Sequence, residues 1–246
     1  MFHIISDLQL SYFDQAPDQN LLNKDPEYII ITGNISNENK RSMMYAEGLA
    51  KIYQNSKIIF NCGITELTQS EYYKIQDGFN LRINDFKKSP PNLYYPKGVC
   101  IEEYDFYCTI GWPIFSNEED FLEFIDETKI IAGWDEKLYI DDILVTDVYN
   151  RYLGLEDIKK LADDEQEQIK SWLSKNSGKQ KILISSLGNK SSNILGNNFT
   201  VFDRLDLSNV IWICGGSEDF IGTDKNCRTI SLPGKDRTRY ISNLLE

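Results

Sequence analysis

The chain has 246 residues and a formal net charge of −12, with one histidine and five cysteines. Apolar residues make up 41% of it, which is enough for a buried core, and we expect residues 1–246 to form a single domain. The acidic balance argues against a nucleic-acid partner, because phosphate contacts need concentrated Lys and Arg. A single histidine excludes a hydrolase built on several imidazoles.

The sequence gives no sign of a membrane or secreted protein. No apolar run reaches the roughly 20 residues that a membrane-spanning helix needs. The first residues lack a basic segment followed by a long apolar one, so no secretory signal is expected. The cysteines are odd in number and scattered, which indicates buried thiols rather than disulfides. Together these features predict a cytoplasmic protein.

Eight apolar, β-branched runs bounded by turn residues predict strands. In chain order they are Phe2–Ser6, Tyr28–Thr32, Lys57–Asn61, Val99–Glu102, Asp105–Ile110, Lys181–Ser185, Val210–Cys214 and Cys227–Leu232. Several of these runs have no polar face, which is typical of strands that are covered on both sides.

Helical patterns fall between some of these strands. Asn39–Tyr53 carries apolar residues at near-helical spacing. Asp163–Lys175 has acids in its first turn and a lysine near its end, which suits the helix dipole. The polar Gln69–Asn92 predicts a helix and loop insertion, and the dense acids of Glu118–Asp142 predict a solvated face. Strands that alternate with helices early and follow one another later indicate an α/β fold with mixed sheets.

The residues that follow each strand are the candidate site residues, because sites in open α/β sheets form beyond the carboxyl ends of the strands. Polar or small residues follow five of the predicted strands. They are Asp7 and Gln9 after the first strand, Asn34 after the second, Asn61 and Cys62 after the third, Ser186 after the sixth, and Gly216 and Glu218 after the seventh.

In this order the strand ends resemble the calcineurin-like metallophosphoesterase family over nearly the whole chain. The family pattern is Asp-x-His, Gly-Asp, Gly-Asn-His-Asp/Glu, a late His, and Gly-His-x-His. Here Asp7-Leu8-Gln9 keeps the Asp, Gly33-Asn34 has an amide for the bridging carboxylate, and Asn61-Cys62-Gly63 keeps only the Asn. Ser186 stands where the late His would be, and Gly215–Glu218 lacks the last two His. The resemblance implies a four-layer αββα sandwich of two mixed β-sheets flanked by helices.

The family site holds two metals that activate a bridging water. Its bridging Asp holds two cations close together, whereas Asn34 offers one neutral carbonyl oxygen. We therefore expect a degenerate member with no catalytic residues and no cofactor, and a vestigial metal-site pocket rewired by hydrogen bonds. An alternative stays open: a weak single-metal phosphoesterase or nuclease. It would hold one Mg²⁺, Ca²⁺ or Mn²⁺ through oxygens of Asp7, Asn34, Asn61 and Glu218.

A fold kept without its chemistry favours a pseudoenzyme that acts as a binding or scaffold subunit, with a protein partner or by self-association. A sensor that binds a small ligand in the pocket is a third class. Large aromatic residues on loops are typical interface anchors, although they can also cap a core. The candidates are Tyr94, Tyr95, Trp112 and Phe115.

Overall fold

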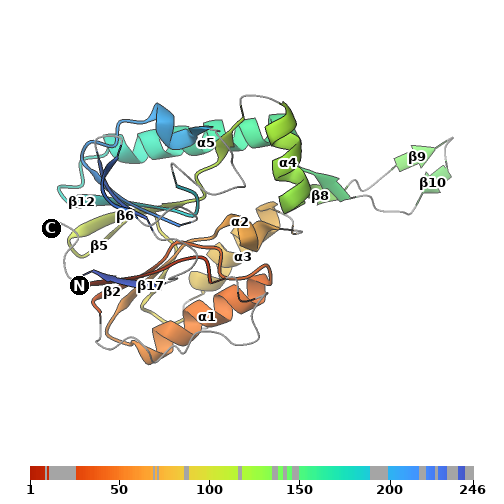
Figure 1. The fold of residues 1–246 in the computed structure, drawn as a ribbon. Coiled ribbons are helices and arrows are strands. Elements are labelled where there is room, and N and C mark those ends of the chain that lie inside the picture. Colours follow the sequence, from red (N-terminus) through yellow and green to blue (C-terminus); the bar gives the residue numbers. More distant parts are fainter. Residues whose placement is uncertain are drawn as a thin grey trace.

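In a computed structural model, the chain forms four layers in the order helix, sheet, sheet, helix (Figure 1). The predicted fold class is confirmed, because two mixed sheets pack together between helices. The residues that the structure describes are 1–8, 10, 26–68, 70, 72–85, 89–115, 118–134, 138–140, 143–145, 150–188, 199–215, 220–224, 227–231 and 238–241.

The first sheet has the strand order β17-β1-β2-β3-β4. β17 pairs antiparallel with β1, and the other neighbours are parallel. Every residue of β1 and β2 is buried, since the sheet is covered on both faces. The strands are β1 (Phe2–Ile5), β2 (Tyr28–Ile31), β3 (Lys57–Phe60), β4 (Leu93–Tyr94) and β17 (Thr238–Ile241).

The second sheet has the strand order β15-β16-β14-β12-β6-β5. Its four central strands are parallel, and the edge strands β15 and β5 are antiparallel to their neighbours. The strands are β5 (Lys97–Ile101), β6 (Tyr104–Thr109), β12 (Gln180–Ser185), β14 (Val210–Cys214), β15 (Phe220–Asp224) and β16 (Cys227–Ser231).

Helices cover the outer face of each sheet, with α1 below the first and α5 above the second in Figure 1. None of the helices in the described parts of the chain is long and apolar enough to cross a membrane. The helices are α1 (Asn39–Ile52), α2 (Ile64–Leu67), α3 (Tyr72–Ile83), α4 (Glu118–Thr128), α5 (Leu155–Ser174) and the 3₁₀ helix η2 (Val201–Arg204). Three further sheets have two strands each. They pair β7 (Pro113–Ile114) with β13 (Phe199–Thr200), β8 (Ile131–Trp134) with β11 (Asn150–Tyr152), and β9 (Leu138–Ile140) with β10 (Ile143–Val145).

Each of the eight predicted strands is present, and differences occur elsewhere. α5 begins at Leu155, earlier than predicted, because the Asp157 carboxylate accepts the Gly154 N–H at 2.8 Å and caps the helix there. α4 crosses the region predicted as a solvated face, and it buries Phe124 in the core. Cys100 is exposed, because β5 is an edge strand, whereas the other four cysteines are buried.

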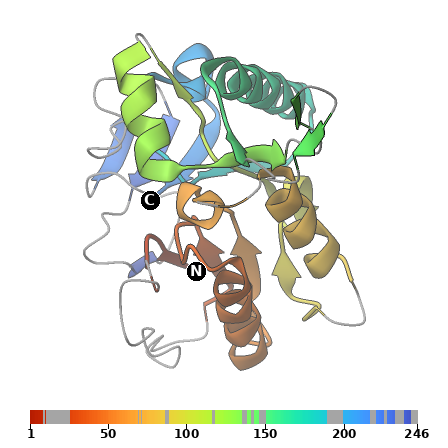
Figure 2. The same ribbon diagram turned by 90° about the vertical axis from the view of Figure 1, so that its right-hand side faces the viewer.

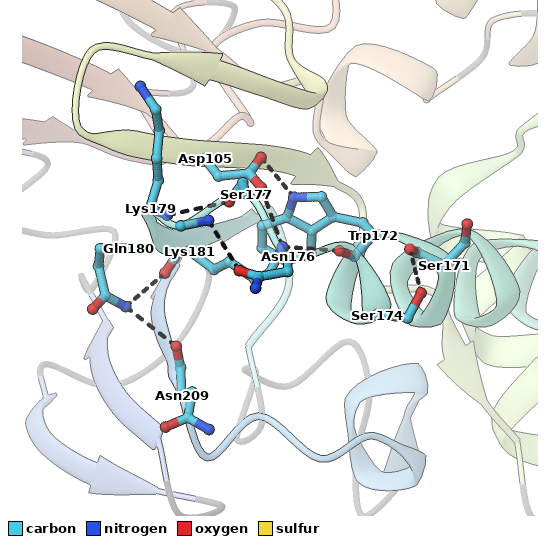
Figure 3. Close-up of polar contacts among 11 residues, drawn as sticks. Asp105, Ser171, Trp172, Ser174, Asn176, Ser177, Lys179, Gln180, Lys181 and Asn209 are labelled. Atoms are coloured by element: carbon cyan, nitrogen blue, oxygen red, sulfur yellow. Dashed lines mark hydrogen bonds and ion pairs between the residues drawn. The ribbon is translucent and has the colours of Figure 1, made fainter.

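The end of α5 is tied to the second sheet by a buried polar cluster (Figure 3). Trp172 Nε1 donates to Asp105 Oδ1 at 2.8 Å, and Lys181 Nζ lies 3.1 Å from Asp105 Oδ2. Burial by itself raises the pKa of Asp105, but hydrogen bonds from Trp172 and Lys181 outweigh it and lower that pKa below its ordinary value. The cluster fixes the position of α5, and with it that of Glu165, about two turns earlier on the same helix.

His3, in β1, is 8% exposed, and burial lowers the pKa of its imidazole to about 4. The unfolded chain, with a pKa of about 6.5, binds the proton more readily. The contribution of His3 to stability is therefore complete above about pH 6.5 and is lost as the pH falls through 4. Because the chain has a single histidine, NMR can follow the imidazole directly. We expect a titration midpoint near 4, and a midpoint at the ordinary value would show that the ring reaches water.

Candidate functional site

The carboxyl ends of β1, β2, β3 and β12 meet at one edge of the sandwich, the end that faces the viewer in Figure 2. The structure places five of the predicted site residues there. All of them are buried: Asp7, Asn34, Asn61, Cys62 and Ser186. The other three predicted residues, Gln9, Gly216 and Glu218, lie outside the described residues.

A hydrogen bond joins Asp7 to Asn34 at the centre of this edge. Asn34 Nδ2 donates to Asp7 Oδ1 at 2.8 Å, and the Ser6 hydroxyl donates to Asp7 Oδ2. Asp7 and Asn34 both have left-handed backbones, with φ of 51° and 59°, a region that Asn and Asp adopt more readily than most residues. Each oxygen of the Asp7 carboxylate therefore has a protein donor.

The orientation of the Asn34 amide follows from its other partners. The Thr65 backbone N–H donates to Asn34 Oδ1 at 3.0 Å, and only the carbonyl oxygen can accept that bond. The Ser186 hydroxyl lies 3.4 Å from the same oxygen. Asn34 thus presents its N–H group, not its oxygen, to Asp7.

Two glycines pack directly against this pair. A Cβ on Gly63 would lie 2.5 Å from the Asn34 nitrogen and closer still to Asn34 Oδ1. A Cβ on Gly215 would lie 2.9 Å from Asp7 Oδ2 and would collide with the Ser6 hydroxyl. Gly63 stands where the family pattern has an acidic residue, and a side chain there would collide with Asn34, whereas Gly215 stands where the pattern itself has a glycine.

Asn61 links the two sheets. Its Nδ2 donates to Thr32 O at 2.9 Å and to Thr109 O at 2.7 Å, at the ends of β2 and β6. The side chain is 1% exposed, and among the described residues its Oδ1 has no hydrogen-bond partner. A buried acceptor without a donor costs free energy, so this oxygen is the best candidate ligand atom at the site.

Glu66, which the sequence analysis missed, organises the loop around Asn34. Its fully buried carboxylate accepts five hydrogen bonds of 2.6 to 3.2 Å, from the N–H groups of Asn34, Ile35, Ser36 and Gly63 and from the Ser42 hydroxyl. Burial raises the pKa of Glu66, and these donors oppose the rise. The signal was present in the sequence, since a Glu three residues after Gly63 has the spacing of a capping box.

Glu165 on α5 holds the loop after β6 in place through hydrogen bonds to its backbone. Its carboxylate accepts the Ile110, Gly111 and Trp112 N–H groups at 2.9 to 3.1 Å, as well as the Thr109 hydroxyl. The two loops that flank the site are therefore each held by one carboxylate, from the fully buried Glu66 and the half-buried Glu165. The oxygens of Glu66 and Glu165 are occupied by these hydrogen bonds, so neither carboxylate is a good candidate ligand for a metal.

Cys62 stands at the position that the resemblance gives to a His. Its thiol is fully buried, and burial and the nearby Glu66 raise its pKa well above the ordinary value. It is therefore protonated at neutral pH, and a thiol in that state is a poor nucleophile and a poor metal ligand.

Among the site residues that the structure describes, the donor set does not fit a two-metal centre. A cation between Asp7 and Asn34 would meet an N–H group where a bridging carboxylate is needed. Within the described residues, the only cluster of three or more His, Cys or carboxylate groups close enough to share an ion is exposed Glu27, Glu102 and Glu103. That cluster precedes β2 and follows β5, away from the carboxyl ends that hold the site.

The aromatic interface candidates differ in exposure. Trp112 is 1% exposed and Tyr95 is 9% exposed, so in this structure both are core side chains rather than exposed anchors. Trp112 is buried because the loop after β6 is drawn onto α5 by Glu165. Tyr94 and Phe115 are half-buried, and Phe115 borders a cavity of about 300 Å³ between β7 and α5.

Comparison with known proteins identifies the fold of the chain through structural similarity, and not through sequence. No protein-family model matches the chain, and no curated protein matches its sequence. Its structure is similar to that of a phosphopantetheinyl hydrolase from Mycobacterium tuberculosis, with 10% identity, a TM-score of 0.61, and 94% of this chain and 88% of that chain covered. A dimetal phosphatase from Danio rerio matches with 12% identity, a TM-score of 0.38, and coverage of 95% and 87%. The chain has a metallophosphoesterase-like fold.

Replacing Asn34 with Asp tests the role of the amide as a donor. The Asn34→Asp variant puts two carboxylates at hydrogen-bond distance, which raises the pKa of one of them. We expect a loss of roughly 2–4 kcal/mol in unfolding free energy at pH 7. The folded pair holds a proton that the unfolded chain releases, so the loss should be smaller at low pH. Urea denaturation at two pH values measures both effects.

The matched control is Asn84→Asp, the same change at an exposed position, which should leave stability within about 0.5 kcal/mol. Mn²⁺ should recover part of the stability that Asn34→Asp loses, because a cation neutralises the pair. An Asn34→Asp variant as stable as the parent at pH 7 would contradict the assigned hydrogen bond.

Glu66→Gln tests the buried carboxylate. The amide NH₂ group would face backbone N–H donors, and at least one donor would be left without an acceptor. We expect a loss of about 2–4 kcal/mol in unfolding free energy, measured by urea denaturation. Glu119→Gln, at an exposed position of α4, is the control and should change little. Equal stabilities of the two variants would refute the role given to Glu66.

Proposed function

We propose that this metallophosphoesterase-fold chain is hydrolytically inactive and acts as a binding or scaffold subunit. The observation that carries the proposal is the hydrogen bond from Asn34 Nδ2 to Asp7 Oδ1. It puts a protein donor where a metal-dependent phosphoesterase of this fold needs a cation. The two clamped loops and the glycine contacts support the same conclusion, because they leave the site closed around its own hydrogen bonds.

The partner we propose is another protein or a second copy of the chain. The half-buried Phe115 and the cavity of about 300 Å³ beside it support a contact surface near the end of β7. Leu155, on the rim of the same cavity, is 37% exposed. Charged residues line the same cavity, and an apolar patch beside polar groups is typical of protein interfaces; the charged residues are Glu156, Lys159, Asp163 and Arg204. The acidic charge of the chain favours a protein partner over nucleic acid.

One observation favours the alternative of a weak single-metal phosphoesterase. The buried Oδ1 of Asn61 has no partner among the described residues and could ligate one hard cation together with Asp7. The cation would supply Lewis-acid activation of a water. Asp7 would then share its carboxylate between the cation and the hydrogen bond from Asn34.

The deciding experiment measures hydrolysis of bis(p-nitrophenyl) phosphate by the purified protein, with and without Mn²⁺ or Mg²⁺. We expect no turnover above that of an Asp7→Ala variant prepared in parallel, because the bridging carboxylate is absent. Elemental analysis of the same preparation should show no stoichiometric Mn, Fe or Zn. Metal-dependent turnover that disappears in Asp7→Ala would establish the alternative, since a contaminating enzyme would not respond to that substitution.

A further inference from the structure

Residues of α1 and α3 line a groove on the surface of the protein. Figure 1 shows where these two helices lie. The groove has a volume of about 540 Å³, within the range of ligand-binding sites. Its floor is apolar and is formed by Met43, Ile75 and Phe79. No residue of the groove belongs to the site at the strand ends, so its use does not depend on whether that site is active.

The walls of the groove are adaptable and open. Met44 lines it and is 59% exposed, and together Met43 and Met44 are two of the three methionines in the chain. Methionine is enriched on surfaces that bind helices, because its unbranched side chain can adjust to different apolar partners. Gly78 on the facing helix adds no bulk, and a Cβ there would meet nothing within 4 Å.

The rim of the groove is basic, although the chain as a whole is strongly acidic. Lys40, Lys51 and Lys74 line it and are exposed. The single acid of the lining, Glu47, is already engaged by Arg82, whose Nε lies 2.6 Å from its carboxylate. The three lysines take part in no ion pair found in the described part of the chain. The groove therefore combines an apolar floor with uncompensated positive charge.

We propose that this groove binds an amphipathic helix of a protein partner, with the apolar ridge of that helix on the methionines and acidic residues along its flanks. The lining residues on α1 extend from Asn39 to Lys51, about 18 Å, or roughly three turns of a bound helix. Lysines lie near both ends of this span, so a short anion would reach only some of them. Binding of a helix in a groove between two helices uses this combination of apolar anchors and complementary charge. The inference goes beyond the proposed function, because it names the chemistry of a partner.

The probe is a synthetic, fluorescein-labelled peptide with leucines on one face of a helix and glutamates on both flanks. The control is a second peptide of the same design that has lysines in place of the glutamates. Fluorescence anisotropy should show saturable binding of the glutamate peptide and at least about tenfold weaker binding of the lysine peptide. Added salt should weaken binding of the glutamate peptide, because the lysines are exposed. Equal binding of the two peptides, or binding of neither, would overturn the proposal.

Substitutions in the protein test whether the peptide binds in the groove. The double variant Lys40→Glu, Lys74→Glu should bind the glutamate peptide about tenfold less tightly, and Met44→Gln should weaken it through the lost apolar contact. Lys160→Glu, an exposed change on α5 at the opposite outer layer, should bind as the parent does. Circular dichroism confirms that each variant is folded. Unchanged affinity in both groove variants, or displacement of the peptide by anionic lipid vesicles, would refute a helix-binding groove. Phosphodiesterase assays on the same preparations report separately on the proposed inactivity.

Discussion

The hydrogen bonds to the buried carboxylate of Glu66 hold the site edge together. Four backbone N–H groups, three of them from consecutive residues after β2, converge on one side chain from α2. Without that acceptor these buried donors would be unsatisfied, and the loop could not hold Asn34 at a positive φ. The position of the Asn34 backbone therefore depends on Glu66, and the orientation of its amide towards Asp7 depends on Thr65.

Glu66 and Glu165 have the same role at the two sheets, which is to accept hydrogen bonds from backbone N–H groups of a loop. Each comes from a helix, reaches back to a loop that follows a parallel strand, and accepts a run of backbone donors. Burial raises the pKa of both carboxylates, and the surrounding N–H dipoles oppose that rise and stabilise the charged form without a metal. In this chain negative charge near the site is balanced by amides, and Asn34 extends the pattern to Asp7.

The sequence predicted much of the fold, because apolar β-branched runs mark buried strands directly. Gathering Asp7, Asn34 and Asn61 at one edge followed from the same reasoning, since parallel strands end together. The hydrogen bond between Asn34 and Asp7 was not predictable, because it depends on the amide orientation that Thr65 sets. The burial of Trp112 could not be predicted for a similar reason. Its burial is caused by Glu165, which is distant in the sequence, and local pattern alone cannot show such a contact.

The packing of Gly63 against Asn34 has a consequence for how such a chain could change over generations. A side chain at position 63 would collide with Asn34, so an acidic residue could be introduced there only after Asn34 had moved. A carboxylate at position 34 would in turn repel Asp7 until a cation was bound. Each of these single steps towards a metal centre therefore passes through a less stable protein, which makes the present arrangement difficult to convert into one.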